Sequence, residues 1–119
     1  MTKPPLVLNL PYPPSVNKYW RRTRSGGVRV SGEGVAYREA VVAYCKAERL
    51  PRLLGPLSVR LMVYVPDRRR RDLDNILKAL LDALAHGGVY EDDSQITHLE
   101  LTRAGLEPGG RVCAEIKQL

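Results

Sequence analysis

The sequence lacks the patterns that mark several common protein classes. No apolar run approaches the ~20 residues of a membrane-spanning helix. Pro4 and Pro5 interrupt the region where a signal peptide would carry its apolar core. Cysteine is scarce: Cys45 and Cys113 form no CxxC pair, and the two histidines complete no zinc-binding pattern. We therefore expect a cytoplasmic protein with free thiols and no membrane contact.

Signatures of several kinds of catalysis are missing too. The chain contains no nucleotide P-loop, no dinucleotide fingerprint and no Ser/His/Asp or Cys/His arrangement, so we expect no nucleotide cofactor. It has no internal repeat, low-complexity tract or linker. A length of 119 residues predicts one domain, spanning residues 1–119.

Positive charge is abundant and unevenly distributed. The net charge is +6 and the pI is about 9.6. Residues 1–59 hold ten lysines and arginines against three acids, a net of +7, so the remainder nets −1. This balance favours a polyanionic partner. The alternative is charge spread over a solvated surface for solubility, which explains the total better than the segregation.

The acids gather in one segment. Between Asp72 and Asp93 lie six acids and a single lysine or arginine, Lys78. Clustered carboxylates hold hard divalent cations such as Mg²⁺, which take oxygen ligands. A bound divalent ion can polarise a phosphate and activate water. A basic protein with such a cluster suggests metal-dependent cleavage of a phosphodiester.

Hydrophobic periodicity and turn residues predict an α+β (mixed α/β) fold. We expect a small, mostly antiparallel sheet with two main helices, in the order strand, hairpin, helix, strand, helix, strand, strand. The predicted strands are 6–10, 57–65, 96–103 and 111–116, with a hairpin or loop over 16–31 and helices over 31–50 and 74–85. The last two strands, which are separated by a glycine-rich segment, are expected to form an antiparallel hairpin.

The predicted metal ligands come from two places in the chain. Asp72 and Asp74 are two apart at a strand-to-helix junction, where their carboxylates can converge. Asp74 also occupies a predicted helix N-cap position. Lys78 lies one helical turn further on. Of the second acidic group, either Glu91 or Asp93 can face the same site, and periodicity does not choose between them.

The second helix is expected to turn one face to the core and the other to this site. Its predicted core stripe consists of Ile76, Leu77, Leu80, Leu81 and Leu84, and its polar side of Asp74, Asn75, Lys78 and Asp82.

Each of these features also has an ordinary structural explanation. Asp74 can be only a helix cap, Lys78 can pair with Asp74 and Asp82 on the helix surface, and residues 91–93 can form a solvated turn. The protein would then be a non-catalytic DNA-binding or architectural protein.

Basic side chains near the acids are candidates to bind DNA. Arg68, Arg69, Arg70 and Arg71 directly precede Asp72, and Lys18, Arg21 and Arg22 surround Trp20. Arginine and lysine contact phosphates, and an aromatic ring can stack on an exposed base. The aromatic residues suit a small hydrophobic core equally well.

The motifs together resemble the RusA family of Holliday-junction resolvases. The resemblance lies in residues 71–78 (RDLDNILK), 81–82 (LD), 88–93 (GVYEDD) and 95–96 (QI), and in the opening 10–21 (LPYPPSVNKYWR) with Tyr37-Arg38. It implies a homodimeric α/β enzyme, bacterial or encoded by a phage or prophage, that acts on four-way DNA junctions in recombination and repair. Such an enzyme makes paired symmetric nicks with Mg²⁺ or Mn²⁺. A relative with relaxed preference for other branched DNA is a further possibility.

The same resemblance assigns roles to individual residues. It implies that Asp72, Asp74 and Asp93 are the catalytic metal ligands, so that Asp93 is favoured over Glu91, and that Lys78 is catalytic. Asn75 and Asp92 become candidates to support these ligands from behind.

Overall fold

One four-stranded sheet forms the centre of the computed structural model, which describes residues 4–119. Its strand order is β1-β6-β4-β5. The strands are β1 (Leu6–Pro11), β4 (Leu57–Val65), β5 (Ile96–Leu106) and β6 (Arg111–Gln118). β6 pairs antiparallel with both β1 and β4, whereas β5 pairs parallel with β4. The predicted α+β class with a mostly antiparallel sheet is confirmed.

The predicted hairpin between the last two strands is wrong. β5 and β6 lie on opposite sides of β4 and do not pair with each other. The chain leaves β4, crosses over through a helix and re-enters the sheet parallel to β4, as such crossovers do. The segment between β5 and β6 then carries the chain past β4 to the other side. Alternating residues indicate that a strand has one buried face, but they do not identify its neighbour.

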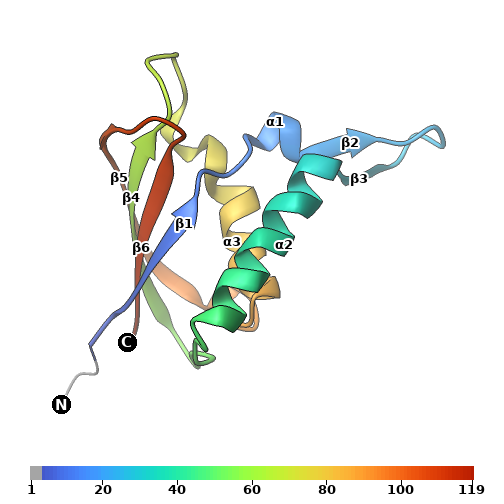
Figure 1. Ribbon diagram of the computed structural model, residues 1–119. Coiled ribbons are helices and arrows are strands. Elements are labelled where there is room, and N and C mark those ends of the chain that lie inside the picture. The colour runs from blue at the N-terminus through green and yellow to red at the C-terminus, as the bar shows by residue number, and fades with distance from the viewer. Residues whose placement is uncertain (1–3) are drawn as a thin grey trace.

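A second, two-stranded ribbon projects from the body of the molecule. It joins β2 (Trp20–Arg22) to β3 (Val28–Val30), and the turn between them contains Gly26 at φ +88°. We call residues 20–30 the arm; Figure 1 shows it extending beyond the helices. The predicted hairpin is confirmed here, although Val16–Tyr19 forms a short helix, α1, rather than strand.

Two helices, α2 (Gly32–Ala47) and α3 (Leu77–His86), cover one face of the sheet (Figure 1). The side chain of Ser31 accepts a hydrogen bond from the amide of Gly34 and so caps α2. The helix ends at Ala47, before the predicted boundary. Among residues 4–119, no helix is long and apolar enough to cross a membrane.

The core lies between these helices and the sheet. Leu57, Val59, Leu61 and Val63 on β4 are at most 1% exposed, because alternate residues of the strand face α2 and α3. Burial of each such side chain contributes about 1.5–3 kcal/mol.

The buried face of the α3 region is rotated about the helix axis relative to the predicted core stripe. Its buried residues are Ile76, Ala79, Leu80, Ala83 and Leu84. Leu77 and Leu81 are only half-buried. The alanines allow α3 to approach the core closely, which leaves Leu77 packed at the edge of the core and Leu81 outside it.

Candidate active site

A short 3₁₀ turn determines where the first two aspartates point. The turn η1 (Leu73–Ile76) precedes α3, and Asp72 before it is extended at φ −73° and ψ 133°. Asp72 therefore holds the N-cap position, and its side chain makes no capping hydrogen bond. The predicted N-cap role of Asp74 is wrong, because the helical turn begins earlier than expected and places Asp74 inside it.

The predicted catalytic residues line one open cavity of about 510 Å³. Asp72, Asp74 and Lys78 come from η1 and α3, and Asp93 comes from the segment before β5. The full lining is Val16, Asp72, Asp74, Asn75, Leu77, Lys78, Leu81 and Asp93. Of the two residues that periodicity left as alternatives, Asp93 lines the cavity and Glu91 does not, and Asp92 does not line it either.

Hydrogen bonds hold the segment that carries Asp93. The hydroxyl of Tyr90, fully buried, donates to the carbonyl of Leu81 in α3 at 2.6 Å. Asp92 and Gln95 form a capping box around the turn η2 (Asp93–Gln95). A hydrogen bond from the hydroxyl of Ser94 lowers the pKa of Asp92. Asp92 thus stabilises the turn that carries Asp93, and its role toward the proposed metal ligands stays a prediction.

The carboxylates of Asp72 and Asp74 have no partner in the protein. Within residues 4–119, no hydrogen bond or ion pair joins either side chain to another residue, and the side chain of Asp93 interacts only with that of its neighbour Asp92. By contrast, Asp67 and Asp82 are both paired. Carboxylates without partners on one cavity are oxygen donors of the kind that hard divalent cations bind.

The carboxylates of Asp72, Asp74 and Asp93 do not converge on a single point. In the described part of the chain, no three aspartate, glutamate, histidine or cysteine side chains are close enough together to form a metal cage. The carboxylates at the cavity are exposed, so the donor set fits a divalent ion in type, and changes of side-chain rotamer would be needed to bring the oxygens around one ion.

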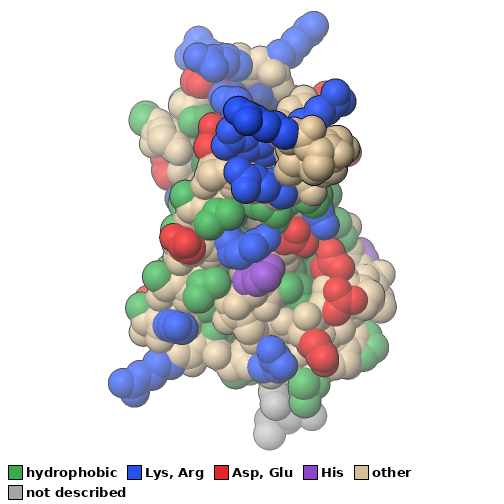
Figure 2. All heavy atoms as spheres, turned by 90° about the vertical axis from the view of Figure 1, so that its right-hand side faces the viewer, with side chains coloured by type: hydrophobic (Ala, Val, Ile, Leu, Met, Phe, Trp, Pro, Cys, Tyr) green, Lys and Arg blue, Asp and Glu red, His purple; other side chains and the backbone are tan. Residues whose placement is uncertain are grey.

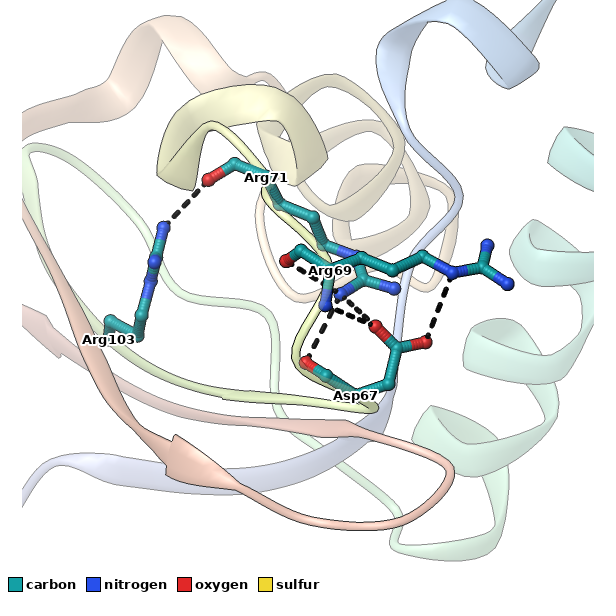
Figure 3. Close-up of polar contacts among 4 residues, drawn as sticks. All are labelled: Asp67, Arg69, Arg71 and Arg103. Carbon is teal, nitrogen blue, oxygen red and sulfur yellow. Dashed lines mark hydrogen bonds and ion pairs between the residues drawn. The ribbon is translucent and has the colours of Figure 1, made fainter.

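The arginine run splits into structural and solvent-facing members. Arg71 donates to Asp67 at 2.6 Å, and Arg69 lies 3.8 Å from the same carboxylate (Figure 3). Hydrogen bonds from Arg71 and from the Arg69 amide lower the pKa of Asp67 to about 2. Arg103 also donates to the carbonyl of Arg71 at 2.7 Å. Arg71 therefore fixes the loop before Asp72, whereas Arg70 is exposed.

A second hollow of about 340 Å³ adjoins the cavity. Its charged lining consists of Lys18, Arg69, Arg70 and Arg71 with the acids Glu33 and Asp72. Asp72 and Asn75 line both hollows, so the two share a wall. Arg68 does not line either one, nor do Arg21 and Arg22, which lie on the arm.

Figure 2 looks down on the arm and shows how charge is divided on this face. Lys and Arg side chains gather in its upper part, and a separate group of acidic side chains lies below and to the right. The arm and the loop that follows β4 lie at the same end of the molecule in Figure 1.

A polar network lies behind Lys78. Its ammonium is 3.3 Å from Oδ1 of Asp82, and the hydroxyl of Tyr19 donates to Oδ2 at 2.7 Å. Arg38 donates to the same hydroxyl at 3.2 Å. Burial raises the pKa of Tyr19, and its bond to Asp82 raises it further, so the hydroxyl stays protonated. The Lys78 ammonium also lies 5.7 Å from the centre of the Trp20 ring.

This network was only partly foreseeable. The Lys78–Asp82 pair follows from helical spacing and was predicted as an alternative role for the lysine. The contact between Tyr19 and Asp82 joins residues 63 positions apart, and no local pattern indicates it. Leu77 and Leu81 were expected in the core rather than in the cavity wall.

Comparison with known proteins identifies relatives over nearly the whole chain. The family described as endodeoxyribonuclease RusA matches residues 11–117. The chain is 44% identical over 111 residues to a crossover junction endodeoxyribonuclease of Enterobacteria phage HK97, covering 92% of each protein. It is 41% identical over 113 residues to the protein of the same name from Escherichia coli K12, covering 94% of this chain and 93% of that protein.

Proposed function

Because the chain belongs to the RusA family, we propose that it is an endodeoxyribonuclease that resolves four-way DNA junctions by paired symmetric nicks. This activity belongs to DNA recombination and repair. The observation that carries the proposal is the cavity lined by Asp72, Asp74, Asp93 and Lys78, whose three carboxylates form no ion pair within residues 4–119. Carboxylates at a DNA-binding surface would repel the phosphate backbone unless a cation lay between them.

The carboxylates suit Mg²⁺, with Mn²⁺ as a substitute. Asp72, Asp74 and Asp93 are the proposed ligands. Such an ion, when bound, polarises the scissile phosphate and lowers the pKa of a bound water. Lys78 neutralises the charge that develops on the phosphate oxygens. Asn75 lines the cavity and can orient a carboxylate or the phosphate through its amide.

The basic surface is proposed to hold the DNA backbone. Lys18, Arg69 and Arg70 line the hollow next to the cavity, where a phosphate beside the scissile one can bind. Arg68 is exposed and directly precedes Arg69 in the chain. Arg21 and Arg22 extend the basic surface along the arm. Arg71 acts mainly by holding the loop, because Asp67 already engages its guanidinium.

Symmetric nicking implies two copies of this site. A homodimer with two-fold symmetry presents one cavity to each of two equivalent strands. We propose that residues 1–119 form one nuclease domain in each subunit and act in the bacterial cytoplasm, where branched DNA arises. The named relatives come from phages and from Escherichia coli, which fits either origin.

One substitution tests the assignment of the cavity. Asp74→Asn should preserve junction binding and abolish cleavage, because it removes a ligand charge without changing the size of the side chain. Labelled four-way junction and duplex are incubated with each protein, with Mg²⁺ and with EDTA. Glu39→Gln, on the exposed side of α2, is the matched control and should cleave normally.

The outcomes separate the alternatives. Metal-dependent paired nicks on the junction support the proposal. Binding without cleavage by the unmodified protein would indicate an architectural DNA-binding protein. Equal cutting of flaps and other branches would indicate a relaxed branched-DNA nuclease.

A further inference from the structure

The lysine at the cavity is held from behind by groups that do not line the cavity. Asp82 offers one carboxylate oxygen to Lys78 and the other to Tyr19. Neither Asp82 nor Tyr19 is among the residues of the cavity wall. The carboxylate therefore bridges a core tyrosine and the lysine that we propose to act on the phosphate.

We propose that Asp82, Tyr19 and Trp20 are positioning residues that fix the ammonium of Lys78 at the edge of the carboxylate-lined cavity. The proposal rests on the function proposed above for Lys78. It goes beyond it by assigning a role to three residues that touch neither the cavity carboxylates nor the phosphate.

Rigid parts of the fold determine the position of Asp82. Tyr19 is 1% exposed, and its hydroxyl receives a hydrogen bond from Arg38 in α2 while it donates to Asp82. Among the described residues, the Tyr19 hydroxyl is the one side-chain group hydrogen-bonded to the Arg38 guanidinium. The Asp82 side chain is 25% exposed, and its carboxylate is restricted on the protein side by Tyr19, which Arg38 of α2 contacts in turn.

Two contacts together restrict the lysine. A lysine side chain is a flexible four-carbon stem ending in a point charge, and it adopts many rotamers when unrestrained. Here the ammonium lies between the Asp82 carboxylate and the Trp20 ring. The ring centres of Tyr19 and Trp20 lie 5.1 Å apart with an interplanar angle of 79°, so the tyrosine contacts both partners of the lysine. An isolated surface ion pair would need neither aromatic residue.

The test compares cleavage rates of Asp82→Asn, Lys78→Ala and the double variant at saturating junction. Removing the carboxylate charge should lower the rate about ten-fold or more, because small displacements of a group at the reacting centre are costly. The junction Kd should not change. The double variant should be no slower than Lys78→Ala, because Asp82 acts only through the lysine.

Three results would overturn the proposal. If Asp82→Asn cleaved the junction at the normal rate and Lys78→Ala cleaved it slowly, the positioning role would be refuted and the proposed function would stand. If Asp82→Asn slowed cleavage by the same factor in the Lys78→Ala background as in the unmodified protein, its effect would be independent of the lysine and structural. Lys78→Ala at the normal rate would refute the lysine's proposed catalytic role and the positioning role with it.

The single tryptophan gives a second measurement that needs no DNA or metal. Indole emission responds to a cation near the ring, so Lys78→Ala should shift the Trp20 spectrum. Asp82→Asn should shift it in the same direction, because the ammonium loses its second contact. Lys46→Ala, at an exposed position of α2, is the control and should leave the spectrum unchanged. A shift in Lys78→Ala alone would show that Asp82 does not hold the ammonium over the ring.

Discussion

Tyr90→Phe should lower the stability of the fold only slightly but reduce the cleavage rate strongly. The Tyr90 hydroxyl donates to the carbonyl of Leu81, and this bond joins α3 to the segment that carries Asp93. Burial raises the pKa of Tyr90 and the charge of Asp93 raises it further, so the hydroxyl keeps its proton for this bond at neutral pH. Phenylalanine keeps the ring and removes only this bond.

The expected loss of stability is small. An intramolecular hydrogen bond contributes about 1 kcal/mol net, and a buried acceptor left without any partner costs about 1–3 kcal/mol. The Leu81 carbonyl lies inside α3, where it also accepts the bond of the helix, so it is not orphaned. We therefore expect a loss of about 1 kcal/mol, which lowers Tm by roughly 3–6 °C for a chain of this size.

The expected loss of activity is larger than this stability change suggests. Without the bond, the backbone before Asp93 is less well fixed relative to Lys78, and misplaced catalytic groups can reduce a rate about a hundred-fold. Thermal unfolding followed by circular dichroism measures the first effect, and cleavage of a four-way junction well below Tm measures the second. A loss above 3 kcal/mol would show that the carbonyl is orphaned. An unchanged Tm with full activity would show that the bond holds nothing in place.

Three further predictions concern the core and the charged surface. Leu80→Ala should destabilise the protein by about 2–5 kcal/mol in denaturant titrations, because it leaves a cavity beneath α3. Arg22→Ala should lower the slope of log K for junction binding against log salt concentration by about 0.9, if the side chain neutralises one phosphate; an unchanged slope would remove it from the interface. The pKa of Asp67 is lowered from the ordinary 3.8 to about 2 in the folded protein. The charged carboxylate therefore contributes stability above about pH 4, and this contribution is lost as the pH falls toward 2. Asp67→Asn should lack this acid-dependent loss in unfolding measured between those pH values.

Local patterns predicted the elements of this fold better than their arrangement. The alternation of Leu57, Val59, Leu61 and Val63 located β4 at its observed bounds, because burial of one face imposes a period of two. The pairing of β5 with β4 depends on contacts between distant segments, so no alternation in β5 or β6 could indicate it. The error over the last two strands has this origin.

The site was predictable where its geometry is local or where a family motif was recognised. The spacing of Asp72, Asp74 and Lys78 within one junction brought them to one cavity, as expected. The choice of Asp93 came from the resemblance, since periodicity allowed Glu91 equally. The contact of Tyr19 with Asp82 depends on how α1 packs against α3, which is a tertiary property that no spacing reports.

The position of β6 has a consequence for the order of events during synthesis. β6 is the last strand of the chain, yet it lies between β1 and β4 and pairs Leu6 with Ile116. Until it emerges from the ribosome, both of these strands present an unpaired edge and the first strand has no place in the sheet. Contacts so distant in sequence form slowly, because a long loop must close first. A chain that stops before β6 would therefore carry the aspartates beside a sheet that lacks its central pairing, since β6 is the strand that joins β1 to β4.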